Sequence, residues 1–338
     1  MKLYQLDLSK RGIGALSMTE RPTPKAGPGQ VLIRLRAFSL NFRDLLIANG
    51  LYPVSVKSDR LIPVSDGAGE VIEIGPGVTR FAKGDRVLAS YFQGWIDGPL
   101  TYPAMGTSLG GGIDGVLAEY VALPEQGVVK IPAGLSFEEA ATLPCAGVTA
   151  WNALVETGRL QSGHSVLVLG TGGVSMIGLQ IAKGKGARVI VTSSSDEKLA
   201  RAKALGADGV VNYKTTPDWD QEVVKLTGGA GVDHVLEVGG AGTLPKSLQA
   251  VGIHGQVNII GVLTGLQNNI DFLPVLVKTA RIQGILVGSR GMLERLTDAL
   301  VASRTKPVID KVFTFDQAID AYRYLEAAHH FGKVVIRV

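Results

Sequence analysis

The first part of the chain, to about residue 125, alternates between apolar and polar positions, which is typical of half-buried β-strands. Over residues 31–37 a face of Val, Ile, Leu and Ala alternates with Arg34 and Arg36. The same reasoning predicts strands over residues 70–74, 86–89 and 116–123. Residues 91–115 are rich in glycine with weak periodicity, and we expect them to form a surface lobe.

The pattern changes near residue 135. Ser136 is followed three positions later by Glu139, the spacing of a capping box, so a helix is predicted to begin there. It would run to about Thr157 and stop at Gly158, with Pro144 bending or breaking it.

From residue 165 onward, short apolar runs rich in β-branched residues alternate with amphipathic segments. Such alternation predicts a parallel sheet covered by helices on both faces. The predicted strands lie at 165–169, 188–192, 209–212, 233–238, 256–261 and 282–287. The predicted helices lie at 173–184, 196–205, 218–227 and 243–251.

A chain of 338 residues exceeds what one hydrophobic core usually holds, so two domains are expected. The six predicted strands complete a sheet by residue 288, and the last helix (316–328) and strand (333–338) should return to the first domain. We therefore predict an α/β protein with a β-rich domain of residues 1–124 and 289–338. Residues 125–288 should form a doubly wound parallel sheet.

A glycine-rich turn directly follows the predicted strand at 165–169 and precedes a helix, which is the context of a dinucleotide-binding fingerprint. Glycine permits the tight turn and lets the backbone approach a pyrophosphate, while the helix N-terminus offers N–H groups to the anion. Ser175 stands at the third position of the motif and is small enough for close packing. A turn without a ligand is the alternative, but the β–α context favours binding. The predicted phosphate-binding residues are Gly170, Thr171, Gly172, Gly173 and Val174.

The end of the next predicted strand indicates which dinucleotide binds. Enzymes specific for NAD usually place Asp or Glu there, on the ribose 2′-hydroxyl. This chain has Ser193 and Ser194 instead, with Lys198 one helical turn later and Tyr213 beyond the third strand. Hydroxyls and an ammonium suit a 2′-phosphate, so NADP(H) is predicted. A capping role for Ser195 and a solvated Lys198 remain compatible with the same residues.

Composition narrows the partners. The net charge of +4 comes from 34 basic and 30 acidic residues that are well mixed, which favours a small anionic ligand over nucleic acid. A single cysteine, Cys145, excludes an intrachain disulfide and fits a reducing compartment. Neither a signal peptide nor an apolar stretch of membrane-spanning length is evident. A cytoplasmic location without membrane association is therefore expected.

The chain resembles the medium-chain dehydrogenase/reductase superfamily along nearly its whole length. The segments that carry the likeness are 41–44 (NFRD), 66–71 (DGAGEV), 75–78 (GPGV), 84–87 (GDRV), 140–144 (AATLP), 149–151 (TAW) and the glycine turn. The resemblance implies a GroES-like catalytic domain, formed by both chain ends, and a Rossmann domain inserted in it.

Many members of that superfamily hold a catalytic zinc, and the resemblance places its ligands at three positions of this chain. The zinc enzymes have Cys where Asn41 stands and a His-Glu pair where Ser65 and Asp66 stand; their third ligand falls at Cys145. One thiol cannot complete a three-ligand site, and residues 91–115 contain no cysteine for a structural zinc. We therefore expect no bound metal, with Cys145 serving as a small core residue.

Without a metal to polarise a carbonyl, the substrate should already be electrophilic, such as a quinone, an enone or another activated alkene. The resemblance points to the zinc-independent, quinone-oxidoreductase-like branch. Asn41 is the first candidate to donate a hydrogen bond near the nicotinamide, and Tyr52 is a candidate proton source. Arg43 and Asp66 are further candidates, although a structural ion pair of Arg43 with Asp44 is an equal alternative.

The geometry of the family implies further contacts at the ends of the parallel strands. The nicotinamide half of the cofactor should meet Thr149, Val238, Gly239, Gly261, Val262, Leu286, Val287 and Gly288. Residues 282–287 would form an exposed edge strand, so a homodimer paired through this edge is expected.

Two other functions remain open at this point. An alcohol or aldehyde dehydrogenase of the same superfamily would lose activity with a chelator and regain it with zinc. A structural protein of the crystallin type would bind NADPH with little turnover.

Overall fold

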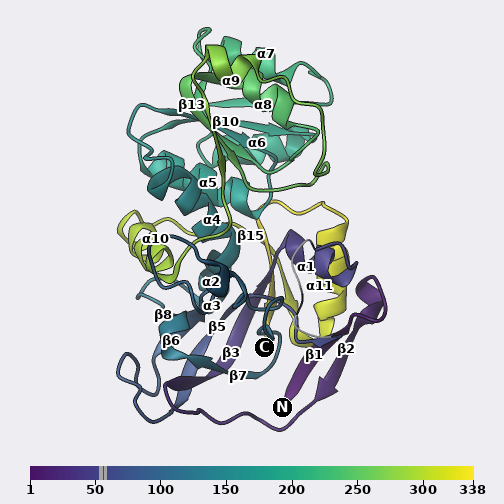
Figure 1. Ribbon diagram of the computed structural model, residues 1–338, viewed down its shortest axis with the longest axis vertical. Helices are drawn as coiled ribbons and strands as arrows, with labels where there is room; N and C mark the ends of the chain where they lie inside the picture. Colours follow the sequence, from purple (N-terminus) through teal and green to yellow (C-terminus); the bar gives the residue numbers. More distant parts are fainter. Residues whose placement is uncertain (53–55, 57–58) are drawn as a thin grey trace. The chain divides into compact units, whose positions relative to one another are not determined.

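The computed structural model describes residues 1–52, 56 and 59–338 (Figure 1). It divides into two compact units. The first contains Met1–Val148 and Gly288–Val338, and the second contains Thr149–Val287. The purple N-terminal strands and the yellow C-terminal elements of Figure 1 therefore belong to one unit. The sequence analysis assigned residues 125–148 to the parallel-sheet domain, whereas the structure places them in the first unit.

The first unit is built on a mixed sheet in the order β15-β16-β3-β5-β6-β8, with β7 also paired to β3. These strands are β3 (Gln30–Leu40), β5 (Asp66–Ile74), β6 (Arg86–Ala89), β7 (Tyr120–Pro124), β8 (Val128–Lys130), β15 (Ile309–Thr314) and β16 (Lys333–Arg337). A smaller sheet joins β1 (Lys2–Asp7), β2 (Leu16–Glu20) and β4 (Arg60–Leu61). The helices α1 (Phe42–Ala48), α2 (Tyr102–Met105) and α11 (Ala318–Glu326) complete this part of the unit.

Residues 125–148 join the first unit because β8 pairs with β6 in its sheet. The helix expected from Ser136 to Thr157 is real at its start: Ser136 caps α3 (Phe137–Ala141) in a capping box with Glu139. It is not continuous, because Pro144 cannot donate a backbone hydrogen bond. Wider π-helical turns at 143–147 and 152–156 flank the short α4 (Val148–Trp151).

The segment 91–115, expected as a surface lobe, is divided: residues 97–99 and 101–103 are exposed as expected, whereas residues 91–93 and 108–111 are packed inside the first unit. Phe92, Trp95 and Leu109 are all buried. The strand predicted over 116–123 is also shorter than expected, since only Tyr120–Pro124 pairs with β3. The glycine-rich segment therefore combines an exposed stretch with tight turns around buried aromatic residues.

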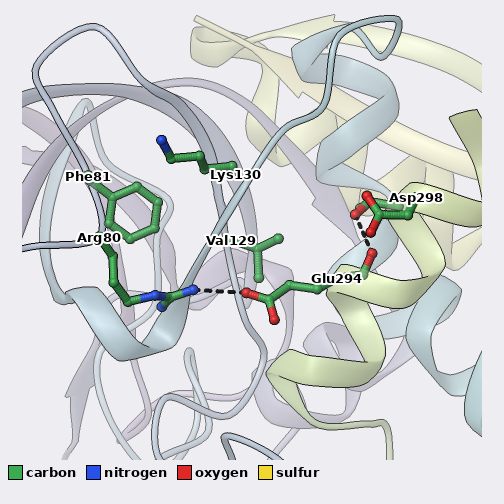
Figure 2. Close-up of a pocket in the computed structure, with 7 residues that line it drawn as sticks. Arg80, Phe81, Val129, Lys130, Glu294 and Asp298 are labelled. Carbon is green, nitrogen blue, oxygen red and sulfur yellow. Dashed lines mark hydrogen bonds and ion pairs between the residues drawn. The ribbon is translucent and has the colours of Figure 1, made fainter.

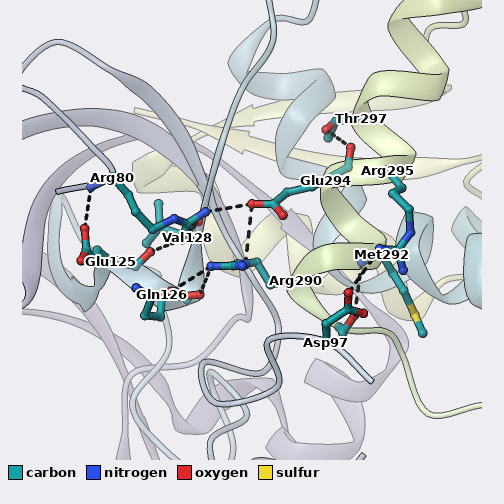
Figure 3. Close-up of polar contacts among 12 residues, drawn as sticks. Arg80, Asp97, Glu125, Gln126, Val128, Arg290, Met292, Glu294, Arg295 and Thr297 are labelled. Carbon is teal, nitrogen blue, oxygen red and sulfur yellow. Dashed lines mark hydrogen bonds and ion pairs between the residues drawn. The ribbon is translucent and has the colours of Figure 1, made fainter. Parts of the chain in front are cut away.

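The helix α10 (Arg290–Ala302) was not predicted. It belongs to the first unit, where charged contacts join it to Arg80 (Figure 3). The Arg80 guanidinium donates to Glu294 Oε1 at 2.8 Å and to the carbonyl oxygen of Glu125 at 2.7 Å. Arg290 Nε lies 3.6 Å from Glu294 Oε1, one helical turn away. These contacts join the returning chain to residues of the N-terminal half.

The second unit is a six-stranded parallel sheet in the order β11-β10-β9-β12-β13-β14, which is the doubly wound order with its reversal beside β9. Its strands are β9 (Ser165–Leu169), β10 (Arg188–Ser193), β11 (Gly209–Asn212), β12 (Val232–Glu237), β13 (Val251–Ile259) and β14 (Arg281–Gly284). Its longer helices are α5 (Gly173–Gly184), α6 (Asp196–Ala204), α7 (Trp219–Leu226), α8 (Leu244–Ala250) and α9 (Leu273–Val277), coloured teal to green in Figure 1. The predicted fold class is confirmed.

Over the part of the chain that the structure describes, none of the helices combines the length and apolar character needed to cross a bilayer.

Candidate functional site

The glycine turn in the second unit has the geometry of a phosphate site. Gly170 adopts φ +70°, a left-handed conformation that an L side chain rarely takes, and it donates its N–H to Thr192 O at 2.9 Å. Gly172 is the N-cap of α5, and no side chain caps that end of the helix. The first N–H groups of a helix have no intrahelical acceptor, so the N-terminus of this 12-residue helix suits an anion. We call the turn Gly170–Val174 with the start of α5 the glycine site.

Ser175, which departs from the glycine motif, has a structural role. Its hydroxyl donates to Leu169 O at 2.7 Å and ties the helix to the end of β9. Gly178 then lies so close to β12 that an added Cβ would stand 2.3 Å from Leu236 Cδ1. The serine therefore preserves the tight packing of helix on sheet that the fingerprint requires.

The end of β12 is organised by Glu237, which the sequence analysis did not single out. Its side chain is fully buried and accepts hydrogen bonds from Gly239 N at 2.8 Å, Gly240 N at 3.0 Å and Thr243 Oγ1 at 2.5 Å. A fourth bond comes from the hydroxyl of Ser247. The carboxylate thus shapes the turn that carries Val238 and Gly239, two predicted cofactor contacts.

The predicted cofactor contacts Gly261 and Val262 lie in the turn that follows β13. A Cβ on Gly261 would stand 2.3 Å from Val238 O, so the turns after β12 and β13 touch through their main chains. A mostly apolar pocket of about 480 Å³ beside these turns includes Val262 in its lining.

Val287, the last residue of the second unit, has φ +56°. A β-branched residue in this region costs about 1–3 kcal/mol. Asn152 Nδ2 donates to Val287 O at 2.8 Å, and Thr157 Oγ1 in turn donates to Asn152 Oδ1 at 2.8 Å. The strained backbone therefore has a buried amide to hold it, next to Leu286 and Gly288.

The predicted 2′-phosphate residues gather at the ends of β10 and β11. Ser193 is buried, and its Oγ accepts from Ser195 N at 3.3 Å. Ser195 is the N-cap of α6, accepting from Lys198 N, as the alternative reading of this segment anticipated. Tyr213 N donates to Ser193 O at 3.1 Å, which places the half-exposed tyrosine beside this strand end.

In the first unit, the positions that resemble zinc ligands converge with a lysine. Lys333 Nζ donates to Asn41 Oδ1 at 2.6 Å and to Leu40 O at 2.7 Å, and it lies 4.0 Å from Asp66 Oδ2. The other Asp66 oxygen accepts from Ser65 Oγ at 2.6 Å, and Cys145 N lies 3.4 Å from Oδ2. We call Asn41, Asp66, Cys145 and Lys333 the buried cluster.

Burial shifts the titration of these groups. It raises the pKa of Asp66, although Lys333 and the amide of Asn41 pull that pKa down. Burial lowers the pKa of Lys333, and Asp66 opposes the change. The Cys145 residue keeps some accessible surface, yet desolvation and the neighbouring Asp66 raise the pKa of its thiol well above the usual range.

Arg43 and Tyr52 lie near the cluster, but their contacts differ from those expected of catalytic groups. Arg43 donates to the carbonyl oxygens of Leu109 and Gly110 at 2.9 and 3.1 Å, and its Nη1 lies 3.6 Å from Asp44 Oδ1. These bonds tie a loop to α1, which supports the structural role. The hydroxyl of Tyr52 lies 3.0 Å from that of Tyr91, and Arg43 stacks on both rings.

Sequence reasoning missed Lys333, Tyr91 and Glu237. Lys333 begins a strand, KVVIR, whose other positions are mostly apolar, and a lysine in such a strand was the available signal. Tyr91 stands in a segment without periodicity and left no signal.

A second depression of about 370 Å³, lined by Arg80, Phe81, Val129, Lys130, Glu294, Thr297 and Asp298, lies beside α10 (Figure 2). Three of its four charged side chains have protein partners: Arg80 pairs with Glu294, and Lys130 with Asp85 at 3.0 Å. It therefore has the character of a structural ion-pair surface.

Two protein-family models match the chain: the alcohol dehydrogenase GroES-like domain over residues 27–133 and the zinc-binding dehydrogenase over residues 173–302. A zinc-type alcohol dehydrogenase-like protein of Schizosaccharomyces pombe is 45% identical over 334 residues, covering 97% of this chain and 96% of its own. The chain belongs to the medium-chain dehydrogenase/reductase superfamily. It is accordingly an NAD(P)-dependent oxidoreductase with a GroES-like domain and a Rossmann domain.

Solved structures of this superfamily agree with the fold. An alcohol dehydrogenase of Sinorhizobium meliloti superposes with a TM-score of 0.92 at 44% identity, over 100% of this chain and 99% of its own. An NAD-dependent alcohol dehydrogenase has a TM-score of 0.90 at 36% identity, over all of both chains. A mycobacterial protein complexed with NADPH has a TM-score of 0.84 at 26% identity, also over all of both chains.

One relative has a more specific name. It is a 2-methylene-furan-3-one reductase of Solanum lycopersicum, 34% identical over 93% of this chain and 73% of its own. The matched proteins thus include alcohol dehydrogenases and a reductase of a conjugated ketone.

The family name implies zinc, and the residues present do not fit it. Asn41, Asp66 and Cys145 offer one amide, one carboxylate and one thiol, whereas a zinc site in a protein is built from three or four thiolate, imidazole or carboxylate ligands. The carboxylate is already bonded to Ser65, and the Lys333 ammonium lies among the donors. No set of three or more His, Cys, Asp or Glu side chains with metal-binding geometry occurs in the described ranges 1–52 and 59–338 or at residue 56. The buried cluster holds a protein cation instead.

Proposed function

We propose that the protein is an NADPH-dependent reductase of electrophilic acceptors, namely quinones, enones or other activated alkenes, that works without a catalytic zinc. The observation that carries the proposal is the ammonium of Lys333 within 2.6 Å of Asn41 Oδ1 and 4.0 Å of Asp66 Oδ2. A zinc ion bound by these residues would be repelled by that charge and would find too few anionic ligands.

Reduction of an activated acceptor does not require a metal ion to polarise a carbonyl group. Bound NADPH would supply the hydride, and an oxygen of the acceptor would become negatively charged as the hydride adds. Hydrogen-bond donors placed in a dry site can stabilise such an oxygen by several kcal/mol. Asn41 Nδ2 is a buried donor without a hydrogen-bond partner in the described structure, so it can take this role. The adjacent hydroxyls of Tyr52 and Tyr91 could deliver the proton that completes the reduction.

The preference for NADPH rests on the end of β10. Ser193 and Ser194 stand where a carboxylate would repel a 2′-phosphate, and Lys198 follows in α6. The nearby carboxylate of Asp196 accepts from Asn212 Nδ2 at 2.7 Å and is thereby held by the protein. A phosphate would gain charge-assisted hydrogen bonds from these hydroxyls and the ammonium.

The test is the loss of NADPH absorbance with a panel of acceptors that includes benzoquinone, cyclohexenone and simple aldehydes, run in parallel with NADH. We expect turnover of quinones or enones and a preference for NADPH. Failure of every acceptor would contradict the proposal.

Alcohol dehydrogenation is the second candidate, because several of the similar proteins are named as alcohol dehydrogenases or as alcohol dehydrogenase-like. Reduction of NADP⁺ by simple alcohols, with no activity toward enones, would favour it.

We also propose that two copies of the chain pair through β14. This strand is bonded on one side to β13 and ends the sheet, and its side chains are exposed. The neighbouring α9 exposes Phe272, Leu273, Leu276 and Val277 by 59–73%. An exposed edge strand with an apolar patch favours self-association. Light scattering during size-exclusion chromatography should give the mass of a dimer for the wild type. The Leu276→Glu variant should give the mass of a monomer.

A further inference from the structure

Lys333 is the least expected member of the buried cluster. Its side chain is 3% exposed, and its ammonium has three oxygen neighbours: the carbonyl of Leu40, the amide oxygen of Asn41 and the carboxylate of Asp66. Burying a lysine is costly unless it is paired and hydrogen-bonded. Most of the polar contacts that meet this cost come from the residues that resemble zinc ligands.

The topology fixes the lysine there. Strand β16 runs antiparallel to β3, with Val334 opposite Leu40, so Lys333 reaches the chain just after β3 ends. Gly332 precedes it with φ +89°, and Lys333 N donates to Val308 O at 2.9 Å. The lysine backbone is therefore held on both sides, and its side chain reaches Asn41 from a rigid strand.

The ammonium decides which way the Asn41 amide faces. An ammonium only donates, so the atom 2.6 Å from Nζ must be the amide oxygen, not the amide nitrogen. The backbone of Asn41 is fixed as well, because its N–H donates to Asp44 Oδ2 at 2.8 Å. Asn41 is 8% exposed, and Nδ2 makes no hydrogen bond to the described protein, although the amide lies near enough to Asp66 to favour its ionised form.

A buried amide nitrogen without a partner is costly unless a ligand uses it. We propose that Lys333 is a positioning residue that locks the Asn41 amide with Nδ2 presented as the hydrogen-bond donor to the substrate oxygen. This role rests on the reductase function proposed above. The lysine orients a neutral donor toward the oxygen on which a zinc ion would act directly in the metal-dependent relatives.

The decisive variant is Asn41→Asp. It keeps an oxygen for the Lys333 ammonium and removes the donor, so the protein should fold and bind NADPH as the wild type does. Removing one oxyanion donor costs roughly 100-fold to 1,000-fold in kcat. We expect a fall in kcat of about that size, with KM and NADPH affinity changed less than threefold. Asn41→Ala serves as a second variant should the added carboxylate disturb folding.

Lys333→Met tests the lock itself. Its kcat should fall at least tenfold while NADPH affinity, followed by cofactor fluorescence, stays within threefold. Lys311→Met makes the same chemical change at an exposed position of the adjacent strand β15 and should leave kcat unchanged. A wild-type kcat in Lys333→Met or in Asn41→Asp would overturn the proposal.

A stability cycle decides the Lys333–Asn41 contact without using activity. Asn41→Asp should lower the folding equilibrium constant at least tenfold more in the Lys333→Met background than in the wild type, because the new carboxylate then lacks its cation. Equal effects in both backgrounds would overturn the lock. If the wild type reduces no acceptor, the reductase function fails, and the cycle still shows whether the lysine holds the amide.

Discussion

The glycine site and the buried cluster are built by different means. The glycine site uses backbone: the left-handed Gly170, the uncapped start of α5, and glycines at 239 and 261 that let main chains touch. The buried cluster uses residues from four separate stretches of the sequence, with Lys333 coming 292 residues after Asn41. A site made of backbone tolerates many side chains but little added volume, whereas a cluster of buried charges loses stability when one charged partner is removed.

The largest expected effect is on the buried cluster. Asp66→Ala removes the acceptor of Ser65 and Cys145 and leaves the Lys333 ammonium without a carboxylate. Breaking a buried ion pair by removing one partner costs about 3–5 kcal/mol, and the free energy of unfolding in urea should fall by that amount. Asp320→Ala, in an exposed pair with Arg323, is the control and should change stability little. A loss no larger than that of the control would show that the cluster is not held by its charges.

The next effect concerns a pair of histidines, His164 and His234, in the same unit as the glycine site. Burial and the nearby His164 lower the pKa of His234 to about 4, from 6.5, and the two rings share a contact of 3.1 Å. Because the unfolded chain binds the proton more tightly, this contribution to stability is complete above pH 6.5 and is lost as the pH falls toward 4. The loss amounts to about 3 kcal/mol.

His234→Gln should flatten the stability of the protein over that pH range and leave NADPH affinity at pH 7 unchanged. Denaturation midpoints at several pH values measure the first effect. An unchanged slope would contradict the assignment.

The backbone character of the second unit predicts sensitivity to a single methyl group. Gly261→Ala would place a Cβ 2.3 Å from Val238 O, and the turn that carries Gly239 must move. Overpacking of this kind costs about 1–3 kcal/mol, and NADPH affinity should fall with it. Gly284→Ala is the matched control, because nothing lies within 4 Å of its added Cβ. Similar affinities for the two variants would remove the basis for a backbone-built site.

The smallest effect concerns cofactor choice. Lys198→Ala should weaken NADPH by about 1 kcal/mol, roughly fivefold, and leave NADH unchanged, because NADH lacks the 2′-phosphate. Fluorescence titration with both cofactors measures the difference, and equal losses for the two would argue against a phosphate contact at this lysine.

The glycine site could be predicted from the sequence more fully than the buried cluster. Local spacing determines the first, whereas contacts between distant residues determine the second. The parallel sheet, the glycine turn and the cap at Ser136 were predictable, because periodicity and local spacing encode strands, turns and helix starts. Family likeness brought Asn41, Asp66 and Cys145 into one list. The lysine that joins them could not be predicted, since its place depends on the register of β16 with β3.

The same limit explains the helix expected through residue 157. A capping box indicates where a helix starts, but α3 ends before Pro144. The π-helical turn at 143–147 then brings Cys145 N toward Asp66. Local signals define elements, and contacts across the sheet define the cluster.

We propose that the Lys333 ammonium lies where the metal-dependent relatives bind zinc. The most direct test measures zinc content and NADPH-dependent reduction of a quinone and an enone in the same preparation, before and after exhaustive treatment with a chelator. We expect full activity in protein that contains far less than one zinc per chain, with no gain when zinc is added. Activity that disappears with the chelator and returns with zinc would contradict it.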